Sequence, residues 1–264
     1  KFLRRLVAEL SANGIKAIGV SYLNSFRNPA HEKRTAEIIG EVAPHIRVSL
    51  SSEVVAEIRE FQRTSTTLAN VYVQERVANY LGQLQARLDQ IGFVGNFFIM
   101  LSSGGIATRE TASRFPVRLL ESGPAAGALA AAQAGLLSRH LDLLSLDMGG
   151  TTPNVCVIED GQPAKTHEFE VDRVYRFRKG SGLPVRIPVI DMIEIGAGGG
   201  SVARVDSLGL LKVGPDSSGA DPGPVCYVLG GTEPTVTDAD LVLGYLDADY
   251  FLGGKMRLDV VGAE

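Results

Sequence analysis

The six residues from Asp147 to Thr152 (Asp-Met-Gly-Gly-Thr-Thr) have the types and spacing that suit phosphate binding. Paired glycines lack Cβ atoms, so the backbone N–H groups around Gly149 and Gly150 can close on phosphate oxygens. The hydroxyls of Thr151 and Thr152 can add hydrogen bonds, and Asp147 can hold Mg²⁺ directly or through its waters. A plain β-hairpin turn is the alternative, because Gly-Gly is common in such turns.

Two strand-like runs enclose these six residues. Leu143–Leu146 is typical of a buried strand and leads directly into Asp147. Val155–Ile158 is typical of a second strand, and Glu159-Asp160-Gly161 has the composition of a turn. We therefore predict a tight β-hairpin with the two glycines at its tip.

A second glycine-rich segment, Gly-Ala-Gly-Gly-Gly-Ser, lies between two predicted strands. Its members include Gly196, Gly198, Gly199, Gly200 and Ser201. The backbone N–H groups of such a loop can cradle an anion, and a close-packed turn is the alternative. A dinucleotide-binding fingerprint is excluded, since no helix clearly follows the glycines.

A run of small residues precedes the hairpin. Glu121, Ser122 and Gly123 open it, and alanines dominate from Gly123 to Gly135. A helix of this composition lets a neighbouring backbone approach closely. Alanine is also the best helix former, so helix stability alone could explain the run.

Helices and strands alternate along the chain, which predicts an α/β fold. The expected helices are one from the start of the chain to Asn13-Gly14, one opened by Asn28-Pro29, one over residues 66–90, and the run from residue 123. The expected strands cover residues 15–20, 45–50, 97–101, 143–146, 155–158, 185–195, 201–205 and 210–213. Because strands, glycines and prolines become dense after residue 143, we place a boundary near residue 140, between regions 1–140 and 141–264.

Composition narrows the class of protein. The 264 residues carry a formal net charge of −4 without a dense Lys/Arg cluster, so nothing in the charge supports a nucleic-acid partner. No apolar run approaches the ~18 residues of a membrane span. The two cysteines and four histidines show no metal-ligand or secreted-disulfide spacing, so we expect a cytoplasmic protein. The basic residues Arg176, Arg178 and Lys179 could meet an anion, although a solvated loop is the simpler interpretation.

Taken together, these motifs resemble the hydantoinase A/oxoprolinase family of the actin- and Hsp70-like ATPase superfamily. This family includes ATP-dependent N-methylhydantoinases, 5-oxoprolinases and acetone carboxylase subunits. The segments that carry the resemblance are Arg63–Thr67, Glu121–Gly127, Asp147–Thr152, Ile195–Ser201 and Gly219–Thr237. The segment Asp191–Gly196 is more similar to the acetone carboxylase branch than to the oxoprolinases.

The resemblance implies an actin-like (ribonuclease H-like) ATPase fold. In that superfamily, a helix of small residues crosses between two lobes just before the second phosphate hairpin. The chain would then contain the end of the first lobe, residues 1–140, with Glu121, Ser122 and Gly123 on the crossing helix. Residues 141–264 would begin the second lobe.

The resemblance also implies chemistry that uses ATP and Mg²⁺. Such enzymes phosphorylate a carbonyl oxygen and so drive ring opening of a cyclic amide such as hydantoin or 5-oxoproline. An ATP-dependent carboxylase subunit of the acetone carboxylase type, acting on a ketone, is the alternative. A non-catalytic ATP-binding module of the Hsp70 type is the alternative from another class. Family members commonly work with a hydantoinase B-type subunit or domain.

Within this resemblance, Asp147 and Asn154 are the candidate catalytic residues. Family members usually have aspartate at the position of Asn154. Asparagine can coordinate a metal or orient water, but it cannot act as a base, and a tolerated exchange at a strand edge is the alternative. The family's first phosphate motif and its adenosine-binding segment find no match in these 264 residues, so we expect the isolated chain to fold without hydrolysing ATP.

Overall fold

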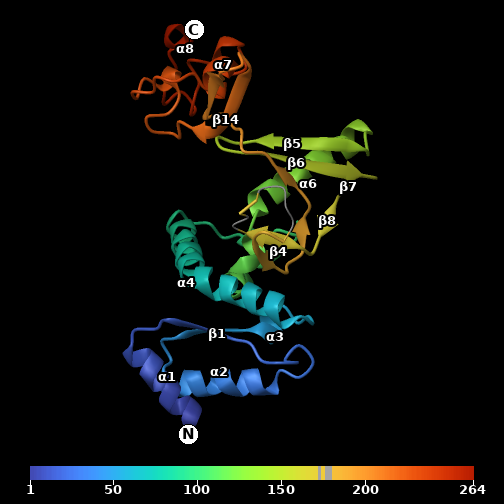
Figure 1. Ribbon diagram of the computed structural model, residues 1–264, viewed down its shortest axis with the longest axis vertical. Coiled ribbons are helices and arrows are strands. Elements are labelled where there is room, and N and C mark those ends of the chain that lie inside the picture. Colours follow the sequence, from blue (N-terminus) through green and yellow to red (C-terminus); the bar gives the residue numbers. More distant parts are fainter. Residues whose placement is uncertain (172–173, 176–179) are drawn as a thin grey trace. The chain divides into compact units, whose positions relative to one another are not determined.

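The computed structural model describes residues 1–171, 174–175 and 180–264. It has the mixed α/β composition that the sequence predicts, and Figure 1 labels its elements. Within the described residues, no helix combines the length and apolar composition that crossing a membrane requires.

The chain divides into two compact units. Unit 1 comprises residues 1–129 and 165–190, and unit 2 comprises residues 130–164 and 191–264. Residues 165–190 thus group with the N-terminal part of the chain, and the lobe boundary near residue 140 stays a prediction.

Unit 1 contains most of the helices. They are α1 (Phe2–Ala12), α2 (Ala30–Val42), α3 (Ser51–Val54), α4 (Glu60–Gln90), α5 (Arg109–Arg114) and the 3₁₀ helix η1 (Pro116–Leu119). Its strands are β1 (Ala17–Val20), β2 (Arg47–Leu50), β3 (Phe98–Met100), β4 (Ile106–Thr108), β8 (Lys165–Thr166), β9 (Phe169–Val171), β10 (Leu183–Val185) and β11 (Val189–Ile190). Helix α6 (Ser122–Ser138) runs from unit 1 into unit 2.

The N-terminal part of unit 1 is built on two parallel strands. β1 pairs with β2, with Ala17 opposite Arg47 and Val20 opposite Leu50. Helices α2 and α4 both pack against this pair, and α1 packs against α2. Parallel strands need a crossover between them, and α2 supplies it.

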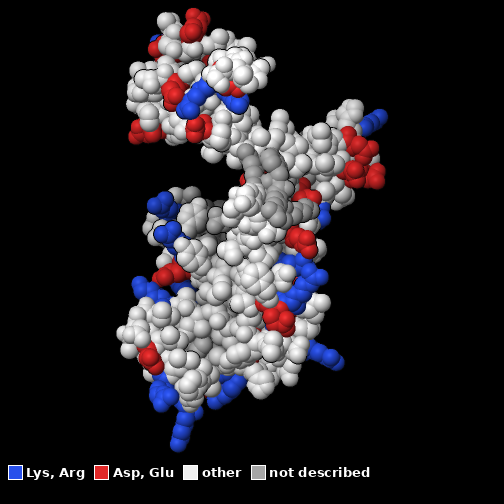
Figure 2. Space-filling model, in the orientation of Figure 1, with Lys and Arg blue, Asp and Glu red and all other residues white. Residues whose placement is uncertain are grey.

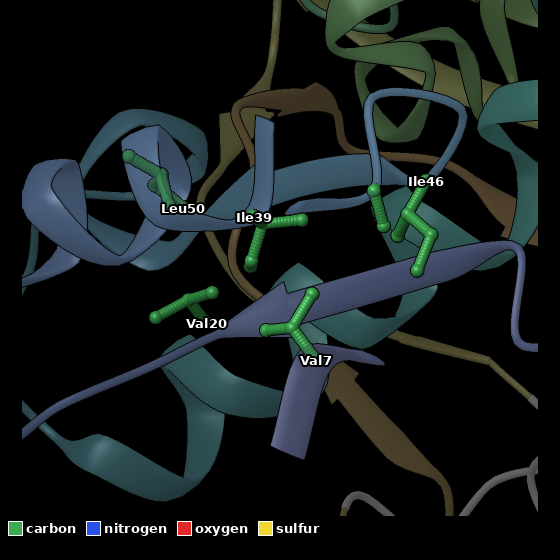
Figure 3. Packing of buried hydrophobic residues seen from close by; sticks show 6 residues of the cluster. Val7, Val20, Ile39, Ile46 and Leu50 are labelled. Carbon is green, nitrogen blue, oxygen red and sulfur yellow. The ribbon is translucent and has the colours of Figure 1, made fainter. Parts of the chain in front are cut away.

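Apolar side chains from these elements form one core cluster. Val7, Val20, Ile39, Ile46 and Leu50 point toward one another (Figure 3), and each is at most 6% exposed. Burial of a side chain such as Ile39 contributes about 1.5–3 kcal/mol. The helical spacing of apolar residues in α1 and α2 and their alternation in β2 therefore both place side chains in this one core cluster.

Helix α4 begins at Glu60, six residues before the predicted start at residue 66. The early turns were missed because their buried face is polar, so they lack apolar periodicity. The buried polar residues of α4 are Arg63, Thr66, Thr67, Asn70 and Gln74.

The predicted strand over residues 185–195 is divided in the structure. β10 ends at Val185, β11 covers Val189–Ile190, and a further strand, β12, covers Ile193–Glu194. Pro188 lies between β10 and β11, and its missing N–H prevents a continuous ladder. The change from unit 1 to unit 2 also falls inside this run, after residue 190.

The named strands of unit 2 all pair in antiparallel fashion. They are β5 (Leu143–Met148), β6 (Pro153–Glu159), β7 (Gln162–Pro163), β12 (Ile193–Glu194), β13 (Ser201–Val205) and β14 (Leu211–Ser217). The helices that follow are η2 (Val225–Tyr227), α7 (Val236–Val242) and α8 (Val260–Ala263), which pack through Cys226, Leu241 and Leu258.

A buried carboxylate holds the loop that follows β1 and the start of α3, which directly follows β2. Glu32 is 0% exposed, and its Oε1 accepts hydrogen bonds from Tyr22 N at 3.0 Å and Ser51 Oγ at 2.6 Å. Its Oε2 accepts from Ser52 N at 2.9 Å. The buried Arg63 donates through Nε to the same Ser51 Oγ at 3.0 Å and through Nη2 to Tyr22 O at 2.6 Å. Glu32 and Arg63 thus share Ser51 as a bridge.

These bonds set the ionisation of Glu32. Burial raises the pKa of its carboxyl, but hydrogen bonds from Ser51 and Ser52 outweigh burial, so the pKa lies below the ordinary glutamate value. A lowered pKa means that Glu32 stabilises the fold above the unfolded-state pKa of about 4.3. This contribution is lost as the pH falls through the lower pKa of the folded state.

We expect Glu32→Gln to lower the free energy of unfolding by about 2 kcal/mol at pH 7. The new amide NH₂ places a donor where the donors at Ser51 and Ser52 need acceptors. Urea denaturation followed by circular dichroism measures the change. Glu37→Gln on the exposed face of α2 is the matched control, and its effect should stay within about 0.5 kcal/mol. The difference between Glu32→Gln and wild type should shrink below pH 4.3, and a pH-independent difference would contradict this account.

Candidate functional site

The predicted hairpin is present in unit 2. β5 and β6 are antiparallel, with Asp147 opposite Asn154 and Met148 opposite Pro153. Gly149 N donates to Thr152 O at 3.1 Å and closes the turn. Asp147, Gly149, Gly150 and Thr151 are exposed, and Thr152 is half-buried. The structure therefore brings the six residues together at an accessible hairpin tip.

Asp147 and Asn154 share one face of the hairpin. Side chains of directly opposed residues project to the same side, with Cβ atoms about 4.5–5.5 Å apart. Asp147 is exposed, whereas Asn154 is 9% exposed and its Oδ1 accepts no hydrogen bond within the described part of the chain. An orphaned amide oxygen therefore lies across from a carboxylate, and hard cations prefer such oxygen ligands.

The glycine-rich segment lies directly against the hairpin tip. Gly199 N donates to Gly149 O at 3.0 Å, and Gly200 N donates to Gly150 O at 2.8 Å. These two bonds join segments that are about 50 residues apart in the sequence.

The amides of this segment are already engaged. Gly198 N donates to Ser201 Oγ at 2.8 Å, and Ser201 N donates to Gly198 O at 2.9 Å. With Gly199 N and Gly200 N bonded to the hairpin, four successive amides have partners inside unit 2. The geometry therefore favours the close-packed turn over an anion cradle for these amides. Gly196, just before them, contributes a carbonyl against which Gly214 packs.

Glycine is required here by close approach of two backbones. A Cβ on Gly198 would lie 2.5 Å from Thr151 N, closer than real Cβ contacts allow. A Cβ on Gly200 would lie 2.8 Å from Ser217 Oγ and 3.2 Å from Gly150 O. In contrast, a Cβ on Gly150 would meet nothing within 4 Å. The tip of the hairpin has open space around Gly150, whereas the face toward the glycine-rich segment is filled.

Thr237, in the first turn of α7, completes the contact. Both its backbone N and its Oγ1 donate to Gly199 O, each at 2.8 Å. Thr235 caps the same helix, and Asp238 accepts from Thr235 N at 2.9 Å and from Cys226 N at 2.8 Å. Burial raises the pKa of Asp238, but hydrogen bonds from Cys226 and Thr235 outweigh it, so the pKa lies below the ordinary aspartate value. Asp238 therefore stays ionised and fixes the start of α7.

Sequence reasoning missed Thr237 as a neighbour of the hairpin. The Thr-Val-Thr-Asp run contains a capping box between Thr235 and Asp238, which was the available signal for a helix start. The contact of that helix with Gly199 depends on tertiary folding, because about 36 residues separate them.

The remaining candidates lie elsewhere or outside the described residues. Glu121, Ser122 and Gly123 lie in unit 1, where Ser122 begins α6. Arg176, Arg178 and Lys179 lie within residues 176–179, which are outside the described residues. No group of three or more metal-ligating His, Cys, Asp or Glu side chains occurs in the described part of the chain.

Figure 2 shows both basic and acidic side chains on the visible face of the molecule, without a broad basic surface there.

Comparison with known proteins gives a consistent result. The hydantoinase/oxoprolinase domain pattern matches residues 63–264, and the pattern of the N-terminal region of the same group matches residues 1–43. Caprolactamase subunit alpha of Pseudomonas jessenii is 37% identical over 249 residues, which are 93% of this chain and 34% of that protein. The gamma subunit of acetophenone carboxylase from Aromatoleum aromaticum is 39% identical over an alignment of 271 positions, which covers 99% of this chain and 35% of that protein.

Two solved structures are similar to this chain. The ATP-dependent caprolactamase of Pseudomonas jessenii superposes with a TM-score of 0.75 at 34% identity, covering 99% of this chain and 36% of that one. Acetone carboxylase in its nucleotide-free form gives a TM-score of 0.75 at 29% identity, again covering 99% of this chain and 36% of that one. The chain thus spans about a third of the length of the relatives that it matches.

We expect Gly198→Ala to destabilise unit 2 by at least about 2 kcal/mol, because its Cβ would overlap the Thr151 backbone. Gly150→Ala, with open space around its Cβ, should change stability by less than about 1 kcal/mol. Cys156 and Cys226 are free and buried in unit 2, so the urea dependence of their alkylation reports on this unit. Equal alkylation midpoints for the two variants would contradict the close packing.

Proposed function

Because the chain belongs to the hydantoinase/oxoprolinase family, we propose that it supplies one phosphate-binding hairpin of an ATP-dependent enzyme that opens cyclic amides. The observation that carries this proposal is the exposed hairpin tip at Asp147–Thr152, whose Gly150 and Thr151 amides donate no hydrogen bond within the described residues. Unpaired, accessible amides beside a carboxylate suit the β- and γ-phosphates of a nucleotide.

The reaction proposed is transfer of the γ-phosphoryl group to the carbonyl oxygen of a cyclic amide. The carbonyl oxygen forms a bond to phosphorus while the bond from phosphorus to the bridging oxygen of ADP breaks. Water then adds to the activated carbon, and the C–N bond of the ring breaks with the nitrogen leaving as the amine. A second water molecule releases phosphate from the acyl phosphate that remains. Positioning and charge neutralisation are the main demands of such a transfer, and a tip of glycines, threonines and one aspartate can meet them.

Mg²⁺ fits the donor set of this site. Asp147 offers an exposed carboxylate, and Asn154 offers an orphaned Oδ1 on the same face. We propose that these two oxygens hold the ion directly or through its waters. When bound, the ion neutralises phosphate charge; Asp147 supplies negative charge, and Asn154 supplies orientation without acting as a base.

An actin-like arrangement of two lobes is part of the proposal. The similarity to both solved structures supports an ATPase fold in which this chain is only a portion. Residues 1–140 would belong to one lobe and residues 141–264 to the next, with α6 as the crossing helix. Catalysis would need a second phosphate motif from elsewhere in the complete polypeptide, so the isolated chain should be inactive.

Carboxylation is the second candidate, because acetone and acetophenone carboxylases are among the matches. The same phosphoryl transfer to an enolate oxygen would serve that reaction. We favour cyclic amide opening because, of the two solved structures, the caprolactamase has the higher identity to this chain, 34% against 29%. No feature of the chain favours a non-catalytic Hsp70-like module.

A partner subunit is also proposed, of the hydantoinase B type. The matched caprolactamase and acetophenone carboxylase chains are themselves named as subunits. We place the enzyme in the cytoplasm, consistent with two free cysteines.

A product assay on the complete polypeptide with its partner tests the reaction class. Hydantoin, 5-oxoproline and caprolactam are each incubated with Mg-ATP, in parallel with acetone and acetophenone plus bicarbonate. Ring-opened product formed together with ADP supports the proposal. Carboxylated ketone as the product would transfer the function to the second candidate, and ADP release without either product would contradict both.

We expect Asp147→Ala in the complete enzyme to lower kcat for ATP turnover about 100-fold or more, because charge contacts of this kind act mainly in the transition state. Asp142→Ala, at the opposite end of the same hairpin, is the control and should leave kcat within about twofold. Steady-state ADP release measures both. If ATP turnover is unchanged in Asp147→Ala, the hairpin is not part of the ATP site.

Asn154→Asp should change the pH dependence of turnover. A buried carboxyl opposite Asp147 has its pKa raised by burial and by the neighbouring negative charge, so the acidic limb of the kcat profile should move to higher pH. Profiles between pH 5 and 9 at several Mg²⁺ concentrations measure the shift. Identical profiles and equal Mg²⁺ dependence in both proteins would make Asn154 a structural residue.

A further inference from the structure

The glycine-rich segment and Thr237 have no role in the function proposed above. We infer that Gly198–Gly200 form a backbone clamp that turns the amides of Gly150 and Thr151 toward the phosphate, with Thr237 as the positioning residue that holds the clamp. This inference rests on the proposed function, since it assigns the amides of the same hairpin their direction.

The direction follows from peptide geometry. In a planar trans peptide group, the C=O of one residue and the N–H of the next point in opposite directions. The carbonyls of Gly149 and Gly150 both point at the clamp, because they accept from Gly199 N and Gly200 N. The N–H groups of Gly150 and Thr151 complete the same two peptide groups. Both amides therefore point away from the clamp, toward the open side of the hairpin tip.

The clamp removes a freedom that the hairpin itself cannot remove. Two adjacent glycines have wide access to backbone conformations, so their peptide planes would rotate easily in an unsupported turn. Two hydrogen bonds on consecutive carbonyls fix both planes at once. Donors that are fixed before the reaction stabilise developing charge without reorganising.

The clamp is not a second anion site. Its amides at Gly198, Gly199, Gly200 and Ser201 all have partners within unit 2. The missing Cβ at Gly198 is filled by the Thr151 backbone rather than by open space. The glycines therefore serve close approach to the hairpin, and the ligand lies on the opposite side of it.

Thr237 acts on the hairpin through Gly199. Its N and Oγ1 both donate to Gly199 O, and Gly199 N in turn donates to Gly149 O at 3.0 Å. Thr237 is 8% exposed and makes no hydrogen bond to the hairpin within the described residues. The relay runs from α7 through Gly199 to Gly149, which makes Thr237 a positioning residue.

The test compares Thr237→Val with Thr237→Ser in the complete enzyme with its partner. Valine keeps the shape and the backbone bond but removes the hydroxyl, which should lower kcat/KM for ATP about tenfold, mainly through kcat. Serine restores the hydroxyl and should return kcat/KM to within about threefold of wild type. If the valine variant does not fold, Thr237→Ala replaces it with the same expectation.

Leu241→Ala is the matched control for stability. Leu241 is buried on the same helix and does not contact Gly199 through a hydrogen bond. It should lower the Tm while leaving kcat and KM unchanged below the melting temperature. If Thr237→Val has a lower Tm but unchanged kcat and KM, the clamp is overturned and Thr237 has only a structural role.

The outcome is separable from failure of the proposed function. If Asp147→Ala lowers kcat strongly and Thr237→Val leaves kcat and KM unchanged, the clamp alone is overturned. No loss in Asp147→Ala overturns the phosphate site and the clamp together. If both variants lose catalytic activity and Thr237→Ser restores it, the phosphate site and the clamp are both supported.

Discussion

Two backbone hydrogen bonds, from Gly199 and Gly200 to the carbonyls of Gly149 and Gly150, organise unit 2. They join the β5–β6 hairpin to the segment that precedes β13, and Thr237 links the same segment to α7. Three parts of the chain that are remote in sequence thus meet at one glycine-lined contact. A Cβ atom at Gly198 or Gly200 would collide with the neighbouring segment and separate them. The shape of the hairpin tip therefore requires glycine at both positions.

Unit 1 reaches a similar result by different means. The loop after β1 and the start of α3 are held by buried charge rather than by glycine, because Glu32 and Arg63 converge on Ser51. A buried carboxylate is tolerated only when its oxygens are satisfied, and hydrogen bonds from Tyr22, Ser51 and Ser52 do this for Glu32. In each unit, polar groups fix irregular backbone that apolar packing alone would leave undefined.

The proposed chemistry is consistent with this construction. A phosphate site needs donors that are already oriented, because reorientation during the reaction would forfeit much of their benefit. On one side the hairpin presents the amides of Gly150 and Thr151, which donate no hydrogen bond within the described residues, while the carbonyls of Gly149 and Gly150 accept hydrogen bonds on the other. Asn154 adds a buried oxygen that has no hydrogen-bond partner among the described residues, which is unusual in a native interior unless a ligand or water satisfies it.

Sequence alone determined the elements whose cause is local. These elements are helices α1 and α2, the strands that flank Asp147–Thr152 and the Gly-Gly turn between those strands. Each follows from residue types that are close together in the sequence, and each is present in the structure. Family resemblance likewise rests on short motifs such as Asp147–Thr152, and comparison over most of the chain confirmed it.

Tertiary structure decided what depends on distant partners. The start of α4 at Glu60 was hidden because its buried face is polar, and the split of residues 185–195 depended on which unit each half joins. Likewise, the sequence left Gly198–Ser201 as either an anion cradle or a packed turn. Glycine suits both, since it permits close approach by a ligand or by another backbone, and only the folded chain shows that the neighbour is the hairpin backbone around Thr151.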